Sequence, residues 1–176
     1  MEFHSIPMSQ VAFENLSILI VDDSKNMRII IRSMLKAFGA KTVFEAENGA
    51  EGFDIMREVN PDLAIVDLKM PILDGFQFTK TVRESDCWET SSTPIIILSA
   101  FSEKKLVMAA HDAGIDAFLC KPISATTLYS RVQHVIEHPR SFVGTNDYFE
   151  RQRRTPSFST EEESAETIPS RDVAEV

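Results

Sequence analysis

The chain has 176 residues, of which 43% are hydrophobic and 26% charged, and its formal net charge is -9. The composition is typical of a soluble globular protein, and the length is enough for one domain with a substantial core or for one domain and a tail. The negative charge argues against a nucleic-acid partner, because phosphate backbones are held by Lys and Arg. No apolar stretch is long enough to cross a bilayer, so we expect no membrane partner.

The N-terminal lead-in, residues 1–15, lacks the apolar segment of a signal peptide. The two cysteines, Cys87 and Cys120, do not have the spacing of a metal site. We therefore expect a cytoplasmic protein in which both thiols are reduced and buried.

The first predicted strand covers residues 16–21 and is followed directly by Asp22 and Asp23. Ser24 is a suitable N-cap for the next helix, because its hydroxyl can accept a hydrogen bond from an N–H of the first turn. Apolar residues then recur at helical spacing and predict one inward face, formed by Met27, Ile30, Ile31, Met34, Leu35 and Phe38. Gly39 predicts the end of this helix.

A strand is predicted at 42–46, followed by a helix that Asn48 can cap and that extends to about Val59. The most apolar part of the chain comes next. Residues 63–66 are fully apolar and too few for a helix, which predicts a strand covered on both faces of a parallel sheet. Asp67 follows where this strand leaves the sheet, at the edge where ligands collect in open α/β sheets.

The alternation of strands and helices continues to residue 138. We predict a helix at 75–83, a polar connection at 85–93, a strand at 95–98 that ends at Ser99, and a helix at 103–113. The last strand, 117–120, ends at Lys121, and Ser124 can cap the last helix. Five such repeats predict an α/β fold, a doubly wound five-stranded parallel sheet with helices on both faces.

Residues 139–176 differ from the rest of the chain. They are rich in Ser, Thr, Glu and Arg and have too little apolar surface to offset the entropy of ordering. We interpret them as a mostly disordered tail.

Polar residues that can do chemistry follow four of the five predicted strands: Asp22 and Asp23, Asp67, Ser99 and Lys121. The carboxyl ends of parallel strands meet at one edge, so these residues should be neighbours. Three close carboxylates repel one another unless a cation compensates, and hard oxygen ligands suit Mg²⁺ or Mn²⁺. A metal and a lysine can neutralise phosphoryl oxygens while one carboxylate acts as nucleophile.

The chain resembles the receiver domain of two-component response regulators, and in particular stand-alone receivers of the chemotaxis-regulator type. The matching residues are Asp22-Asp23, Asp67 with Lys69-Met70-Pro71 and Gly75, Ser99-Ala100, Phe118 and Lys121-Pro122. The resemblance covers residues 16–138 and implies a flavodoxin-like sheet with strand order 2-1-3-4-5.

The resemblance also implies the role of each site residue. Asp67 would accept a phosphoryl group from a phosphohistidine of a sensor histidine kinase or a histidine phosphotransfer protein. Mg²⁺ or Mn²⁺ would be held by Asp23, Asp67 and the backbone carbonyl of Lys69, with Asp22 acting through a water. Ser99 and Lys121 would bind phosphoryl oxygens, and Ser99 with Phe118 would form the switch.

Further expectations concern the lifetime of the phosphate and its readout. Lys69 and Phe101 should flank the approach of water to Asp67 and slow self-dephosphorylation, because neither side chain orients a water for attack. The resemblance implies a cis Lys121-Pro122 bond. It also implies that the signal reaches a downstream protein partner through the face formed by residues 103–138.

Two alternatives remain at this stage. A metal-dependent phosphohydrolase with an Asp nucleophile would place a second Asp two residues after Asp67, where this chain has Lys69. A pseudo-receiver that binds partners without phosphorylation is disfavoured by the intact acidic set. We therefore expect a signalling phosphoacceptor that assists its own phosphorylation and dephosphorylation, not an enzyme.

Overall fold

The computed structural model describes residues 11–100 and 113–139. Contacts divide the chain into Met1–Ser141 and Phe142–Val176, and the fold below belongs to the first unit. The predicted tail from residue 140 on lies outside the described residues. The predicted helix at 103–113 lies outside them as well, except for its last residue.

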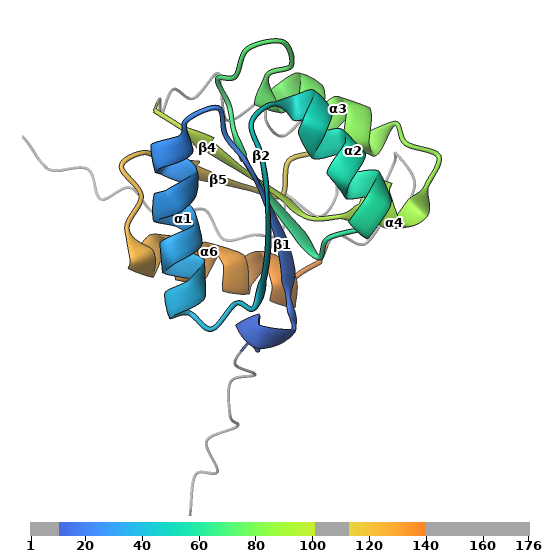
Figure 1. Ribbon diagram of the computed structural model, residues 1–176. Helices are drawn as coiled ribbons and strands as arrows, with labels where there is room; N and C mark the ends of the chain where they lie inside the picture. Colours follow the sequence, from blue (N-terminus) through green and yellow to red (C-terminus); the bar gives the residue numbers. More distant parts are fainter. Residues whose placement is uncertain (1–10, 101–112, 140–176) are drawn as a thin grey trace, which may run out of the picture. The chain divides into compact units, whose positions relative to one another are not determined.

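The sheet has five parallel strands in the order β2-β1-β3-β4-β5, which confirms the predicted topology (Figure 1). The strands are β1 (Ser17–Val21), β2 (Thr42–Ala46), β3 (Leu63–Asp67), β4 (Ile95–Ser99) and β5 (Ala117–Cys120). All residues of β3 and β4 are buried, because these strands have neighbours on both sides and helices on both faces. β3 therefore carries Asp67 into the middle of one edge of the sheet.

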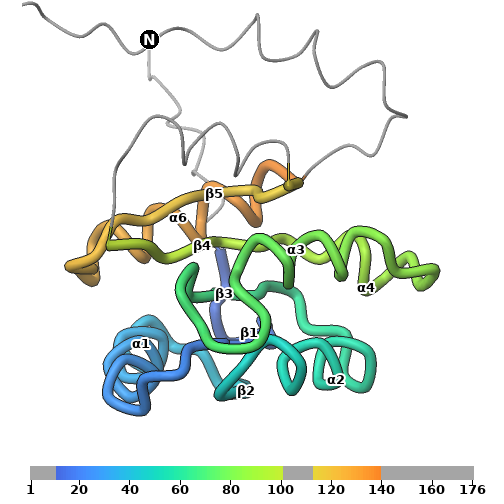
Figure 2. Tube along the Cα trace, turned by 90° about the horizontal axis from the view of Figure 1, so that it is seen from above, coloured from blue at the N-terminus to red at the C-terminus, as the bar shows by residue number. Residues whose placement is uncertain are grey.

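Helices cover both faces of the sheet. They are α1 (Lys25–Ala37), α2 (Gly49–Val59), α3 (Gly75–Arg83), the short α4 (Trp88–Ser92) and α6 (Ala125–Glu137), and a 3-10 turn, η1 (Phe13–Asn15), precedes β1. Helices α1 and α6 lie on one face of the sheet, and α2 and α3 lie on the other (Figure 2).

Alternation along the strands divides the core into two clusters. Ile18 and Ile20 of β1 pack with the apolar faces of α1 and α6, whereas Leu19 and Val21 pack with those of α2 and α3. Successive side chains of a strand point to opposite faces, so each strand supplies both clusters. This packing sets the position of every strand end.

Side-chain caps begin the helices that follow the strands. The predicted caps Ser24, Asn48 and Ser124 accept hydrogen bonds from the N–H groups of Met27, Glu51 and Thr127, respectively. Asp74 and Gln77 form a capping box at the start of α3. Each cap fixes the turn that leads from a strand end into its helix.

The structure corrects three predictions. Ile30 is 46% exposed, because consecutive helical residues are about 100° apart and Ile31 takes the buried position. The connection 85–93 contains the helix α4. Cys87 and Cys120 are free but exposed, since one precedes α4 and the other ends the edge strand β5.

Within the described part of the chain, no helix combines the length and the apolar character needed to cross a membrane.

Candidate functional site

The carboxyl edge of the sheet brings the predicted residues together. Asp67 is the last residue of β3 and Ser99 the last of β4, and both are buried. Asp22 follows β1 directly, and Lys121 follows β5. The N–H of Lys121 donates to the carbonyl of Ser99 over 2.7 Å, which holds these two strand ends in register.

Three carboxylates form an acidic cluster at this edge. One carboxylate oxygen from each of Asp22, Asp23 and Asp67 lies within 4.8 Å of the other two. Asp22 is fully buried, Asp67 is 7% exposed, and Asp23 faces solvent. The cluster therefore has a buried side and an open side.

Lys121 reaches into the acidic cluster from β5. Its Nζ lies 2.7 Å from Oδ1 of Asp67 and 3.2 Å from Oδ2 of Asp22. The sequence separates Lys121 from Asp22 by 99 positions, so only the sheet order makes this contact. One ammonium group thus compensates part of the charge of three carboxylates.

Burial and the neighbouring charges change the protonation of this pair. Burial raises the pKa of the Asp67 carboxyl, and although Lys121 opposes this, the nearby Asp22 and Asp23 act in the same direction as burial. Burial by itself would lower the pKa of Lys121, but hydrogen bonds and charge interactions with Asp67 and Asp22 outweigh it and raise that pKa. Lys121 is therefore held in its charged form.

Arg28 holds the turn that carries Asp22, and the sequence analysis missed it. Its Nη1 donates to the carbonyl of Asp22 over 2.8 Å, and its other nitrogens contact Glu45 at 3.2 Å and Glu47 at 2.7 Å. The sequence contained a signal, because Arg28 stands three positions before buried Ile31 on the inward stripe of α1. An arginine in such a stripe needs several acceptors.

Asp22 is fixed further by the start of α1. Its Oδ1 accepts a hydrogen bond from the N–H of Ser24 over 2.8 Å. With Lys121 on Oδ2, both oxygens of this buried carboxylate have partners.

Gly75 allows the loop after β3 to close against the strand end. A Cβ at this position would lie 2.8 Å from the carbonyl oxygen of Asp67 and 3.0 Å from Cα of Leu68. The N–H of Gly75 donates to the carbonyl of Leu68 over 2.9 Å. The Asp74-Gly75 pair thus starts α3 close to Asp67, where a side chain would not fit.

The acidic cluster borders an open hollow of about 520 Å³. Its lining comes from the β1–α1 turn, from the loop between β3 and α3 and from the first turn of α3, namely Asp23, Leu68, Lys69, Met70, Pro71, Asp74 and Phe76. The exposed carboxylate of Asp23 and the loop with Lys69 therefore lie around one opening. Oxygen ligands with room for water fit Mg²⁺ or Mn²⁺ and do not fit zinc.

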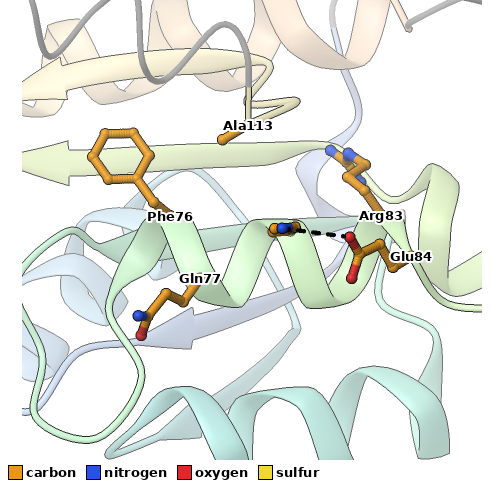
Figure 3. Close-up of a pocket in the computed structure, with 6 residues that line it drawn as sticks. Phe76, Gln77, Arg83, Glu84 and Ala113 are labelled. Atoms are coloured by element: carbon orange, nitrogen blue, oxygen red, sulfur yellow. Dashed lines mark ion pairs between the residues drawn. The ribbon is translucent and has the colours of Figure 1, made fainter.

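A second hollow, of about 410 Å³, lies along α3 (Figure 3). It is lined by Phe76, Gln77, Lys80, Arg83, Glu84 and Ala113, and its ion pair joins the exposed Lys80 and Glu84 at 3.8 Å. A single surface pair of this kind contributes little energy and offers no cluster for chemistry.

The remaining predicted residues have different outcomes. Phe118 is half-buried in β5 and packs against the core cluster of α2 and α3. The Lys121-Pro122 bond is cis, as predicted. Phe101 lies outside the described residues.

An acidic cluster and a paired lysine at the carboxyl edge of a doubly wound sheet define a phosphoryl-accepting signalling domain. Residues 18–133 match the response regulator receiver domain, and the chain belongs to this family. It is a CheY-like response regulator of two-component signalling, a phosphoacceptor and not a classical enzyme.

Individual relatives agree with the family. The chain is 34% identical over 119 residues to the chemotaxis protein CheY of Bacillus subtilis, covering 68% of this chain and 96% of that protein. Chemotaxis protein CheY-3 of Vibrio cholerae is 27% identical over 130 residues, with 74% and 98% covered.

Solved structures show the same similarity. The chemotaxis response regulator CheY4 of Vibrio cholerae has a TM-score of 0.63 at 29% identity, covering 68% of this chain and 98% of that chain. A response regulator receiver domain protein from Clostridium thermocellum has a TM-score of 0.62 at 26% identity, with 70% and 95% covered.

Proposed function

We propose that this cytoplasmic response regulator accepts a phosphoryl group on Asp67 from the phosphohistidine of a sensor histidine kinase or a histidine phosphotransfer protein. The observation that carries the proposal is the position of Asp67 between an excess of carboxylates and one lysine, at 2.7 Å from Lys121 Nζ. The phosphorylated form then passes its signal to a protein partner or to the next carrier of a phosphorelay.

In the transfer step, a carboxylate oxygen of Asp67 attacks phosphorus while the bond between phosphorus and the donor's imidazole nitrogen breaks. The electron pair of that bond stays on the imidazole, and an acyl phosphate forms on Asp67. Lys121 moves its ion pair from Asp67 to the phosphoryl oxygens, and the Ser99 hydroxyl donates to another of these oxygens.

The acidic residues of this chain fit a divalent cation. Asp23 and Asp67 would hold Mg²⁺ or Mn²⁺ directly together with the Lys69 carbonyl, and Asp22 would act through a water. The bound cation supplies positive charge that offsets repulsion between the carboxylates and the incoming phosphoryl group. Asp22 already has Ser24 and Lys121 as partners, which supports the indirect role for it.

The readout uses Ser99 and Phe118. Both residues lie near the carboxyl edge of neighbouring strands, and Phe118 is only partly buried, which supports a role in which it turns inward when Ser99 binds phosphate. The surface for the downstream partner is the face formed by residues 103–138. A phosphate that favours one of two arrangements shifts their populations.

Self-dephosphorylation is slow in this proposal. Lys69 borders the opening beside the acidic cluster, and Phe101 is assigned the other flank. Lys69→Asn together with Phe101→Glu should shorten the lifetime of the acyl phosphate, measured as phosphate loss over time. If this double variant lost phosphate no faster than the wild type, the result would contradict the role of Lys69 and Phe101 in slowing dephosphorylation.

Labelling with a small phosphodonor, phosphoramidate, tests the proposal in the presence of Mg²⁺. The wild type should form an acyl phosphate, and Asp67→Asn should form none. Asp62→Asn is the matched control, because Asp62 precedes β3 at the other end and its carboxylate binds the N–H and hydroxyl of Ser17. Labelling of Asp67→Asn, or labelling that persists after chelation of the metal, would refute the assignment.

A further inference from the structure

Ile72 stands at the centre of an unusual turn in the loop between β3 and α3. The N–H of Leu73 donates to the carbonyl of Pro71 over 2.9 Å, and Ile72 has a φ of 74°. A hydrogen bond across three residues with a central φ near +75° defines the rarer and more strained form of the γ-turn.

The residue type makes this turn unfavourable. Asn and Gly adopt positive φ with little strain, whereas a β-branched side chain there is an outlier. Among the described residues, the other positive φ values belong to Asn60, Gly39 and Gly114, which follow this rule. Ile72 breaks it.

The neighbours of Ile72 impose the conformation. Leu73 packs into the core cluster of α2 and α3, and it lies so close to Gly49 that a Cβ there would be 2.8 Å from Cδ2 of Leu73. The side chain of Asp74 caps α3 by accepting a hydrogen bond from the N–H of Gln77. With Leu73 directed inward, Ile72 projects outward and is 86% exposed, the largest value among the exposed large hydrophobic residues of the described chain.

This strained, exposed side chain belongs to the loop that borders the phosphorylation site. Ile72 is five residues after Asp67, and its loop neighbours Pro71 and Asp74 line the hollow that Asp23 borders. Asp67 is 7% exposed, so a phosphohistidine must enter the opening to reach it, and the protein that carries the phosphohistidine must cover the surrounding loop. A downstream target does not exchange a phosphoryl group with Asp67, so it does not have to cover this loop.

We infer that Ile72 is an apolar anchor for the phosphohistidine-bearing donor protein, held outward by the strained turn so that the donor buries it during transfer. The inference rests on the proposed function of Asp67. The hollow is lined by charged groups such as Asp23 and Lys69, which give little net affinity at a solvated surface, and by apolar groups such as Phe76. Ile72 differs from these in being the most exposed large hydrophobic side chain among the described residues. A single buried aliphatic side chain near the centre of an interface can supply that affinity.

The experiment separates three properties of Ile72→Asn. The temperature of unfolding should stay equal or rise by about 3 °C, because Asn tolerates positive φ. The rate of labelling by phosphoramidate should equal that of the wild type. The kcat/KM for transfer from a donor protein should fall about tenfold, the amount expected for one exposed aliphatic contact that is buried on binding.

The donor probe is the purified, autophosphorylated histidine kinase that transfers fastest to the wild type in a panel of such kinases. Ile72→Val keeps the apolar β-branched side chain and should transfer within about twofold of the wild type. Trp88→Ala is the matched control, because Trp88 is also exposed but precedes β4 at the opposite edge. Its transfer rate should not change.

Three results would overturn the inference. They are equal donor transfer by Ile72→Asn and the wild type, an equal loss with phosphoramidate and with the donor, and a panel in which no kinase phosphorylates the wild type. The second result would mean that Ile72 acts on the site itself. Failure of phosphoramidate to label wild-type Asp67 would instead refute the proposed function.

Discussion

Both edges of the sheet contain charged side chains with little solvent exposure, but among the described residues the carboxyl edge is the one with an excess of negative charge. At the amino edge, Arg83 and Asp116 form a 2.8 Å ion pair with side chains 12% and 9% exposed. At the carboxyl edge, the described residues place Lys121 in ion pairs with Asp22 and Asp67, and Asp23 adds a third carboxylate to the same cluster.

At the amino edge, Arg83 and Asp116 also make several hydrogen bonds to the backbone. Arg83 donates to the carbonyls of Gly114, Ser91 and Thr93 in addition to Asp116, and the same Asp116 oxygen accepts from the N–H of Ile95. These bonds join α3 and α4 to the starts of β4 and β5. A balanced group of this kind stabilises the fold, whereas the excess of negative charge around Asp67 leaves a place for a cation and a phosphoryl group.

The largest expected effect is at the balanced edge. Arg83→Leu should lower the free energy of unfolding by about 4 kcal/mol, because it removes the Arg83 partner of an Asp116 carboxylate that is only 9% exposed. Urea denaturation measures the loss. Arg32→Leu is the control, because Arg32 is 47% exposed in its pair with Glu45 and should cost only about 0.5 kcal/mol. Equal losses in the two variants would remove the distinction between the edges.

Magnesium should stabilise the unbalanced edge. At a concentration 100 times its dissociation constant, Mg²⁺ should raise the free energy of unfolding by about 2.7 kcal/mol, because the folded state alone assembles the acidic cluster. Thermal unfolding at matched ionic strength measures this effect. Asp23→Asn should remove most of it, whereas Asp74→Asn, which keeps a helix-capping side chain, should not. Equal responses of both variants would place the cation elsewhere.

Removing the cation of the site should cost less than removing Arg83, since Lys121 is 20% exposed. Without Mg²⁺, Lys121→Met should lose about 2 kcal/mol at neutral pH, because Asp22 and Asp67 remain uncompensated. Burial lowers the pKa of Lys121, but its carboxylate partners raise it by more. The wild-type advantage should therefore be complete from neutral pH to about pH 10.5 and be lost as pH rises through the folded-state pKa. Urea denaturation across this pH range measures it. An advantage that disappears between neutral pH and pH 10.5 would contradict the pairing.

The smallest effect has the opposite sign. Burial raises the pKa of Asp67, so its ionised form destabilises the metal-free fold as pH rises. Asp67→Asn should therefore gain about 1 kcal/mol at neutral pH, a typical size for a single substitution. The gain should shrink as pH falls toward 3.8, the ordinary pKa of this group. Asp62→Asn should instead lose stability, because it weakens the bonds to Ser17. If both variants lost stability, the result would contradict the excess of negative charge around Asp67.

Local patterns in the sequence were sufficient for the strands and the site carboxylates. The apolar run before Asp67 predicts a buried parallel strand, and the polar residues after four strands predict one shared edge. The structure confirms the sheet and places Asp22, Asp23, Asp67 and Lys121 together. These predictions succeed because strand alternation, helix caps and the common direction of parallel strands depend on residues close in sequence.

The sequence by itself determined the class of fold, the acidic cluster and its lysine, because each follows from local residue types and the rule that parallel strands end at one edge. Only the tertiary structure decided which of Ile30 and Ile31 is buried, that Arg28 holds the Asp22 turn, and that Arg83 pairs with Asp116. It also decided the outward projection of Ile72, which the packing of Leu73 against Gly49 imposes. These features depend on contacts between residues 6 to 33 positions apart, whose partners no local pattern specifies.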